Sequence, residues 1–329
     1  MFKQIIPVFL LVNIGLFQLL VGPISMDFKL WLNKNGYSDD DFESKDFENI
    51  GSFGGKEYFS YTVKKIPVIF IHGNSDGALN NGTPYGSGWN SHLKIFLDNG
   101  YTKAELYGIT WGDRNVNNAL KKTFSCNFVK KIRRFILAVL EYTKCKYVNI
   151  VSHSIGVTLT RKAIKGGIIN ENNDVCDIGE YLGNKVNTFI AISGANYGLC
   201  FCINPFFYET PSCNKKNGFW PGDGQYSNEC INANNYTYQS IEYSKLLQEL
   251  NDDKKPEGKF VVTIFSTGDE LIGNRNKVFG RYTSSLPSAS TQYISHLWNH
   301  TETKDKSQFY VFREIMKNDF KINLINGRF

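Results

Sequence analysis

A strand, a tight turn and a helix follow one another between Lys146 and Ile164, and Ser154 lies at the turn. The segment KYVNIVSHSIGVTLTRKAI begins with the β-branched run of a buried strand and continues at helical spacing after the serine. The residues two positions before and after Ser154 are Ser152 and Gly156, which are both small. Because a strand and a helix joined by so short a turn approach closely, bulky side chains would collide at these two positions. The pattern predicts a serine held on a strained turn with its hydroxyl exposed.

This arrangement predicts the nucleophile elbow of an α/β-hydrolase, although the usual residue at the position of Ser152 is Gly. Alternating strands and helices in the rest of the chain predict a mostly parallel central sheet with helices on both faces. We expect strands at about 67–71, 104–110, 147–152, 186–193, 259–265 and 289–294, and helices at about 86–98, 126–143, 155–166, 239–250 and 303–317. The apolar residues of the helix at 126–143 recur at helical spacing and are expected to form core.

A second part of the pattern lies upstream, where an apolar strand runs into His72-Gly73 and a polar loop. Acyl transfer develops an oxyanion, which needs two backbone N–H groups already directed at it. In this fold one comes from the residue after the nucleophile, here Ile155, and one from the loop after an early strand, here Asn74. Alone, the His-Gly pair would be an ordinary exit from a strand. Together with the serine turn, it predicts an oxyanion hole.

The serine needs a base, and the chain order of this fold is serine, acid, histidine. Three of the five histidines precede Ser154, which leaves His296 and His300. His296 lies in the apolar segment YISHLW, which is typical of a packed, hydrogen-bonded histidine, whereas polar residues suited to begin a helix follow His300.

The acid is expected at the end of the strand within 259–265, because catalytic groups collect at the carboxyl ends of parallel strands. Asp269 and Glu270 follow that strand, and Asp269 is the better placed. Such an acid orients the histidine, which then takes the serine proton. An alternative role for Asp269 is a turn or N-cap carboxylate.

With these residues in place, the chain resembles the class 2 lipase family of secreted α/β-hydrolases, particularly its nematode branch, from about Phe28 to about Lys317. The matching blocks include PVIFIHGNSD, ELYGITWGD, SHSIGVTL, RKAIKGG, GANYGL and TSSLP. The family's last block, a histidine four residues before Lys-Asp, matches His300, and the resemblance also implies Asp269 as the acid. It implies hydrolysis of carboxylic esters.

Net charge is modest, at +6, and no Lys/Arg run is interleaved with aromatic residues, so nucleic acid is not an expected partner. Lys3 precedes an apolar run from Ile5 to Val21 that Pro and polar residues interrupt. Residues 1–25 are therefore expected to be a signal peptide and not a stable membrane span. Residues 26–329 are expected to form a single domain of a secreted, extracellular protein.

Seven cysteines in a secreted chain suggest several bridges and one leftover thiol, for which Cys145 is the candidate. Cys126 and Cys176 flank the helices around the serine strand. A long irregular segment at about 194–238, rich in aromatic residues, predicts a disulfide-tied cap over Ser154 or a static cover of the sheet edge. We expect four cysteines of this segment to pair among themselves: Cys200, Cys202, Cys213 and Cys230.

These features predict a secreted serine hydrolase that acts on lipid esters through Ser154, Asp269 and His300, with Asn74 and Ile155 at the oxyanion. Its expected partner is a lipid or small ester, with a lipid–water interface as one place of action, and neither a cofactor nor a metal is expected. A short-chain esterase or an acyltransferase would use the same triad. A non-catalytic lipid-binding protein on this scaffold is the remaining alternative.

Overall fold

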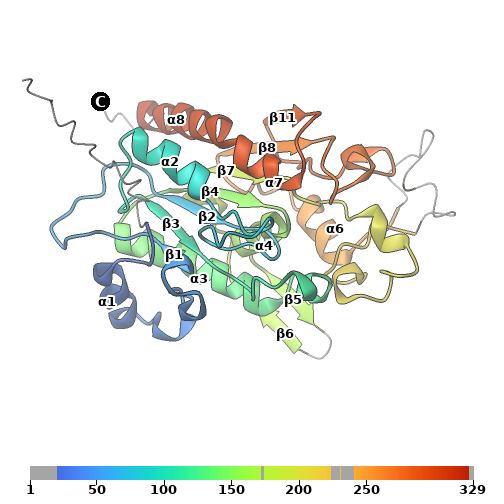
Figure 1. The fold of residues 1–329 in the computed structure, drawn as a ribbon, viewed down its shortest axis with the longest axis horizontal. Helices are drawn as coiled ribbons and strands as arrows, with labels where there is room; N and C mark the ends of the chain where they lie inside the picture. Colours follow the sequence, from blue (N-terminus) through green and yellow to red (C-terminus); the bar gives the residue numbers. More distant parts are fainter. Residues whose placement is uncertain (1–20, 172–173, 224–229, 231–240, 326–329) are drawn as a thin grey trace, which may run out of the picture.

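A computed structural model describes residues 21–171, 174–223, 230 and 241–325. Within them, seven strands form one sheet in the order β1-β3-β2-β4-β7-β8-β11 (Figure 1). All neighbours are parallel except β1 and β3. The strands of this sheet are β1 (Ser52–Phe53), β2 (Val68–Ile71), β3 (Leu106–Ile109), β4 (Val148–His153), β7 (Val186–Ile192), β8 (Phe260–Ser266) and β11 (Thr291–Ser295). The predicted fold class, an α/β-hydrolase with a mostly parallel sheet, is confirmed.

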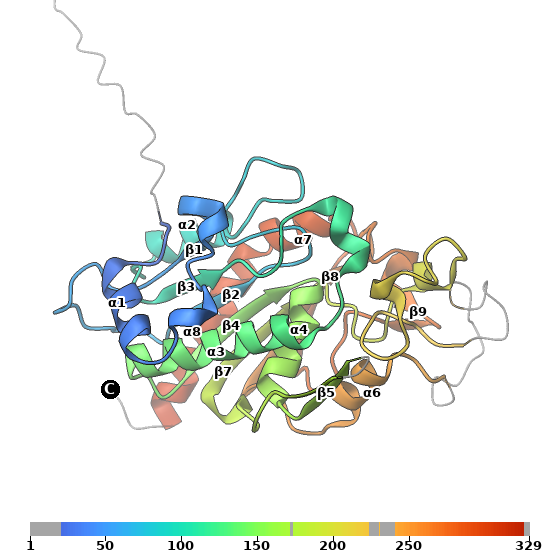
Figure 2. The ribbon, with the colours of Figure 1, turned by 90° about the horizontal axis from the view of Figure 1, so that it is seen from below.

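Helices cover both faces of the sheet (Figures 1 and 2). One face carries α2 (Asn90–Asp98), α7 (His300–Lys306) and α8 (Gln308–Ile325), and the other carries α1 (Met26–Lys34), α3 (Cys126–Thr143) and α4 (Ile155–Lys165). The central strands β2, β4 and β7 are buried along their whole length, as expected for strands covered on both faces. The apolar stripe of α3 packs in the core as predicted.

Several boundaries differ from those predicted. The helix expected at 303–317 is two helices, because α7 ends at Lys306 and α8 begins at Gln308 after Ser307. The helix expected at 86–98 begins at Asn90, since Gly88 has a φ of +59°, which a helix does not allow. The helix expected at 239–250 is α6 (Lys245–Asp252), and residues 239–240 lie outside the described part.

Two small hairpins were not predicted, namely β5 (Ile168–Glu171) with β6 (Asp174–Asp177) and β9 (Lys277–Val278) with β10 (Arg281–Tyr282). The helix α1 was also missed, although Ser25 accepts a hydrogen bond from the Phe28 N–H and caps it. Among the described residues, no helix is both long enough and apolar enough to span a bilayer.

Three disulfides join cysteines 50, 30 and 11 positions apart in the chain, and Cys145 belongs to none of them. Cys200 pairs with Cys230 and Cys202 with Cys213, which confirms the predicted grouping of these four cysteines. The third bridge joins Cys126 to Cys176.

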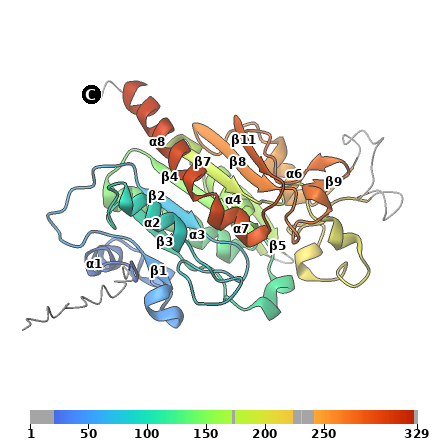
Figure 3. The ribbon, with the colours of Figure 1, turned by 45° about the horizontal axis from the view of Figure 1, so that its top comes forward.

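The predicted cap at 194–238 is described up to residue 223 and at Cys230, and its other residues lie outside the described part. Its residues up to 223 contain only short 3₁₀ turns, among them η5 (Cys200–Ile203) and η6 (Pro211–Cys213). Figure 3 shows this segment at one end of the molecule, beyond the ends of the central strands.

Residues 1–20 of the predicted signal peptide lie outside the described residues. The next five residues pack on the domain, because Val21 and Ile24 are buried and Ser25 caps α1.

A buried polar cluster joins α8 to the amino-terminal ends of the central strands. Asp319 accepts hydrogen bonds from Asn149 of β4 (3.0 Å) and Asn187 of β7 (2.7 Å), and Tyr101 donates to it at 3.5 Å. Burial raises the pKa of Asp319 to about 7, although these hydrogen bonds favour its charged form. Between pH ~4 and about 7, Asp319 is therefore protonated in the folded protein and ionised in the unfolded chain.

Because the pKa of Asp319 is raised on folding, its contribution to stability should be present below pH ~4 and lost as the pH rises to about 7. The Asp319→Asn variant should lack this loss, so the gap between variant and wild type should change by up to about 4 kcal/mol across this range. Urea unfolding at several pH values measures it. Asp98→Asn, at an exposed carboxylate of α2, is the control, and parallel profiles for wild type and Asp319→Asn would contradict the assignment.

Candidate active site

Ser154 lies at the turn between β4 and α4, with a φ of 55° and a ψ of −133°. This is a strained conformation for a residue with a side chain, and such strain is concentrated at functional sites. The Ser154 N–H donates to the Ile192 carbonyl (2.9 Å), which holds the turn against β7. The predicted strand, turn and helix are therefore present, with the serine at the corner.

The two small residues that flank Ser154 have different contacts. A Cβ on Gly156 would lie 2.3 Å from the His72 carbonyl oxygen, so α4 can approach the end of β2 only because this residue has no side chain. Ser152 is fully buried, and its hydroxyl donates to Thr160 Oγ1 on α4 at 3.0 Å. The departure from Gly at position 152 thus adds a hydrogen bond between strand and helix.

His300 is the first residue of α7, and its ring meets the carboxylate of Asp269 beyond the end of β8. His300 Nδ1 lies 2.8 Å from Asp269 Oδ2 and 3.0 Å from Oδ1. Both side chains are buried, and Asp269 Oδ1 also accepts the Leu271 and Ile272 N–H groups. Because its carboxylate is held by backbone donors, Asp269 can fix both the orientation and the tautomer of the imidazole.

Glu270 and His296, the alternative acid and base from the sequence, make other contacts. Glu270 accepts a hydrogen bond from the backbone N–H of His300 (2.9 Å) and so holds the start of α7, while Asp269 holds the ring. His296 is exposed, with its Nδ1 2.9 Å from Thr267 Oγ1. The expectation that His296 is packed in an apolar environment was wrong, because β11 is an edge strand whose side chains are at most half-buried.

Asn74 and Ile155, the candidate oxyanion residues, line the same cavity as Ser154 and His300. Ile155 is the first residue of α4, where the backbone N–H groups of a helix have no partner within the helix. The side chain of Asn74 donates to the Ala119 carbonyl (2.9 Å) and ties its loop to η3 (Val116–Lys121). Its backbone can therefore face the cavity from a fixed loop.

His72 stabilises this loop in a way that the sequence analysis missed. Its Nε2 accepts the Trp111 N–H (3.0 Å), its Nδ1 lies 2.6 Å from the Gly73 carbonyl, and its ring stacks on Trp111. Burial lowers the pKa of His72 to about 4, so the ring is neutral at pH 7. The His-Gly pair could have indicated this role, because a neutral imidazole both donates and accepts.

The cavity has a volume of about 250 Å³, and most of its remaining lining is apolar. No hydrogen bond joins the Ser154 hydroxyl to His300 in the described structure, which is common before substrate binds. Nor do three or more His, Cys, Asp or Glu side chains of the described residues gather so that they could hold a metal ion. The apolar lining residues include Val116, Leu120, Ala195, Leu199, Phe201, Phe219, Leu271 and Ile272.

In comparisons with known proteins, the family described as Lipase (class 2) matches residues 65–312, about three quarters of the chain. No curated protein matches the chain in sequence. Among solved structures, lipase B of Aspergillus fumigatus is similar at 16% identity and a TM-score of 0.44, over 77% of this chain and 52% of that chain. The monoacylglycerol lipase of Paleococcus ferrophilus is similar at 11% identity and a TM-score of 0.42, over 77% and 96%. The fold assignment rests on the topology above and on the family match.

The Gly156→Ala variant tests the close approach of α4 and β2. In an ordinary helix this change adds about 1 kcal/mol of stability. Here the new methyl group would meet the His72 carbonyl, and we expect the free energy of unfolding to fall by about 1–3 kcal/mol. Chemical denaturation measures the change, and a gain in stability would show that no such contact limits this position.

Proposed function

The chain belongs to the class 2 lipase family and is a carboxylic ester hydrolase, and we propose that it hydrolyses lipid esters through an acyl-enzyme on Ser154. The observation that supports this most is the hydrogen bond between His300 and Asp269 beside the cavity that Ser154 and His300 share. Ser154 is the nucleophile, His300 the base and Asp269 the residue that orients it.

In the proposed reaction, the Ser154 hydroxyl attacks the ester carbonyl while the free Nε2 of His300 takes its proton. The carbonyl oxygen becomes negatively charged, and the backbone N–H groups of Asn74 and Ile155 stabilise it. When the tetrahedral intermediate collapses, His300 returns the proton to the leaving alcohol. A water molecule then attacks the acyl-enzyme, with His300 again as the base, and the carboxylic acid leaves Ser154. Neither step uses a cofactor.

A second apolar cavity of about 660 Å³ adjoins the first and supports a lipid substrate. The two share Leu120, Phe201, Leu271 and Ile272, and the second continues past Ile203 and Phe207 of the cap. Under this proposal, an acyl chain bound at Ser154 extends along these shared apolar residues into the second cavity, where each buried methylene contributes about 0.8 kcal/mol.

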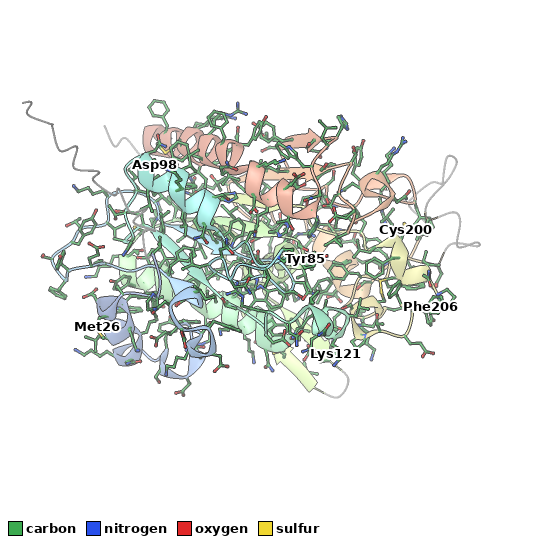
Figure 4. All side chains as sticks on the ribbon, in the orientation of Figure 1. Met26, Tyr85, Asp98, Lys121, Cys200 and Phe206 are labelled. Atoms are coloured by element: carbon green, nitrogen blue, oxygen red, sulfur yellow. A yellow bond between two sulfur atoms is a disulfide. The ribbon has the colours of Figure 1, made fainter. Side chains whose placement is uncertain are left out.

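The mouth of the site supports action at a lipid–water interface. Tyr85, Val116 and Leu271 line the cavity and are about half exposed. Phe206 of the cap is 87% exposed, and Figure 4 shows it at the cap end of the molecule. The exposed apolar side chains of Tyr85, Val116 and Leu271 at the opening are typical of a surface that meets a partner or a lipid.

Secretion is part of the proposal. Disulfides persist in oxidising compartments, and this chain has three of them. Its amino-terminal sequence also has the pattern of a signal peptide. A short-chain esterase and an acyltransferase remain alternatives on the same residues, and a non-catalytic lipid-binding protein would leave Ser154 unreactive.

His300→Ala should lower the kcat for hydrolysis of p-nitrophenyl esters by at least about 10³-fold, close to the level of Ser154→Ala. His296→Ala, four residues earlier in the chain, is the matched control and should keep wild-type activity. A serine-reactive phosphonate should label the wild type at Ser154, which mass spectrometry detects. Comparable losses in the two histidine variants would leave His300 without its proposed role, and no labelling at all would favour a non-catalytic protein.

Filling the second cavity should change the preference for acyl length. Ile203→Trp should lower kcat/KM for palmitate esters about tenfold or more and leave that for butyrate esters unchanged, because a short chain ends before Ile203. Met26→Trp is the control, since Met26 lies at the opposite end of the molecule from the cap (Figure 4). Equal losses on both esters would argue against an acyl path through the cap.

A further inference from the structure

A buried ion pair joins the helix of the candidate base to the loop of the candidate oxyanion hole. The ammonium group of Lys304, on α7, hydrogen-bonds Asp76 Oδ2 in the loop after β2. The Lys304 side chain is 1% exposed and that of Asp76 is 4% exposed. The two residues are 228 positions apart in the sequence, so only the tertiary fold brings them together.

Each partner is close in sequence to a residue of the proposed machinery. Lys304 follows His300 by four residues on the same helix, so both side chains lie on one face. Asp76 follows Asn74 by two residues in the same loop. The ion pair therefore connects the segment that carries the base to the segment that carries an oxyanion donor.

The carboxylate of Asp76 also holds its own loop. Asp76 Oδ1 accepts the Gly77 N–H (2.8 Å) and the Gly88 N–H (2.9 Å). Burial by itself would raise the pKa of Asp76, but the charge and hydrogen bond of Lys304, together with His72 and the Gly88 N–H, outweigh burial, and the pKa lies below its usual value. Asp76 is therefore charged at neutral pH, and its partner in the ion pair is Lys304.

A second contact joins the same two segments. Asp305 Oδ1 lies 3.7 Å from Lys304 Nζ and accepts the Ser87 hydroxyl at 3.1 Å. Ser87 precedes Gly88, whose N–H donates to Asp76, so the hydrogen bonds and ion pairs form a closed circuit between loop and helix. A circuit of this kind resists sliding of α7 along the loop as well as separation from it.

A buried ion pair is weak evidence for stability, because apolar residues of similar size often serve as well. Charged hydrogen bonds are short and oriented, so such a pair restrains the distance and orientation of its two groups more closely than an apolar contact does. The location of this pair therefore indicates a geometric role.

We propose that Asp76 and Lys304 are positioning residues of the ester hydrolysis: they hold the Asn74 N–H at the distance from Ser154 and His300 that the tetrahedral intermediate requires. This inference rests on the proposed function. On this proposal the pair contributes to stabilisation of the transition state and not to substrate binding, because only the transition state carries the oxyanion.

The test compares Asp76→Asn, Lys304→Met and the double variant, which removes both charges of the buried pair. The kcat per active site, counted by phosphonate labelling, should fall about a hundredfold in each, with KM changed less than about threefold. Inhibition by an alkyl boronic acid, whose serine adduct is tetrahedral, should weaken by a similar factor. Lys304→Arg, which keeps the charge, should recover part of the kcat.

Lys306→Met is the matched control, because Lys306 lies on the same helix and forms an exposed ion pair with Glu302. It should keep wild-type kcat and inhibition. A double variant with wild-type kcat and boronate affinity per labelled site would overturn the proposal, even if its melting temperature were lower. An inactive and unlabelled wild type would instead refute the proposed function, so the two failures are distinguishable.

Discussion

The close approach of α4 to the end of β2 is the constraint on which the site depends. Gly156 lies against the His72 carbonyl, and this contact brings the first turn of α4 beside the His-Gly loop. Because the helix is so near, Ser154 must make its turn in a strained conformation that exposes its hydroxyl. The same contact places Asn74, two residues past His72, and Ile155 along one cavity.

The electrostatic environment of His300 differs from that of the other buried histidines. Burial lowers the pKa of His72 to about 4, that of His92 to about 3 and that of His153 well below its usual value, so these rings are neutral. Within the described part of the chain, His300 is the one buried histidine that forms a hydrogen bond with a carboxylate, that of Asp269. A carboxylate stabilises the imidazolium that general-base catalysis would create, and the other three rings have no such partner.

The cap shows how a segment with little regular structure can still form a wall of the site. Its residues up to 223 contain 3₁₀ turns in place of helices and strands, and two disulfides close loops within the cap. Such bridges limit the unfolded ensemble and so favour one arrangement of the loops. Phe201 and Phe219 can then present apolar surface to the cavity without a core of their own.

The sequence by itself determined the local parts of this protein: the turn at Ser154, the buried strands, the stripe of α3 and the grouping of four cysteines. Each of these depends on residues near one another in the chain, so spacing and side-chain size were sufficient. The tertiary structure alone decided that Glu270 binds the backbone of His300, that His296 is exposed and that Lys304 meets Asp76. Those contacts join residues 30 or more positions apart or depend on which strand forms the sheet edge, and no local pattern encodes such distances.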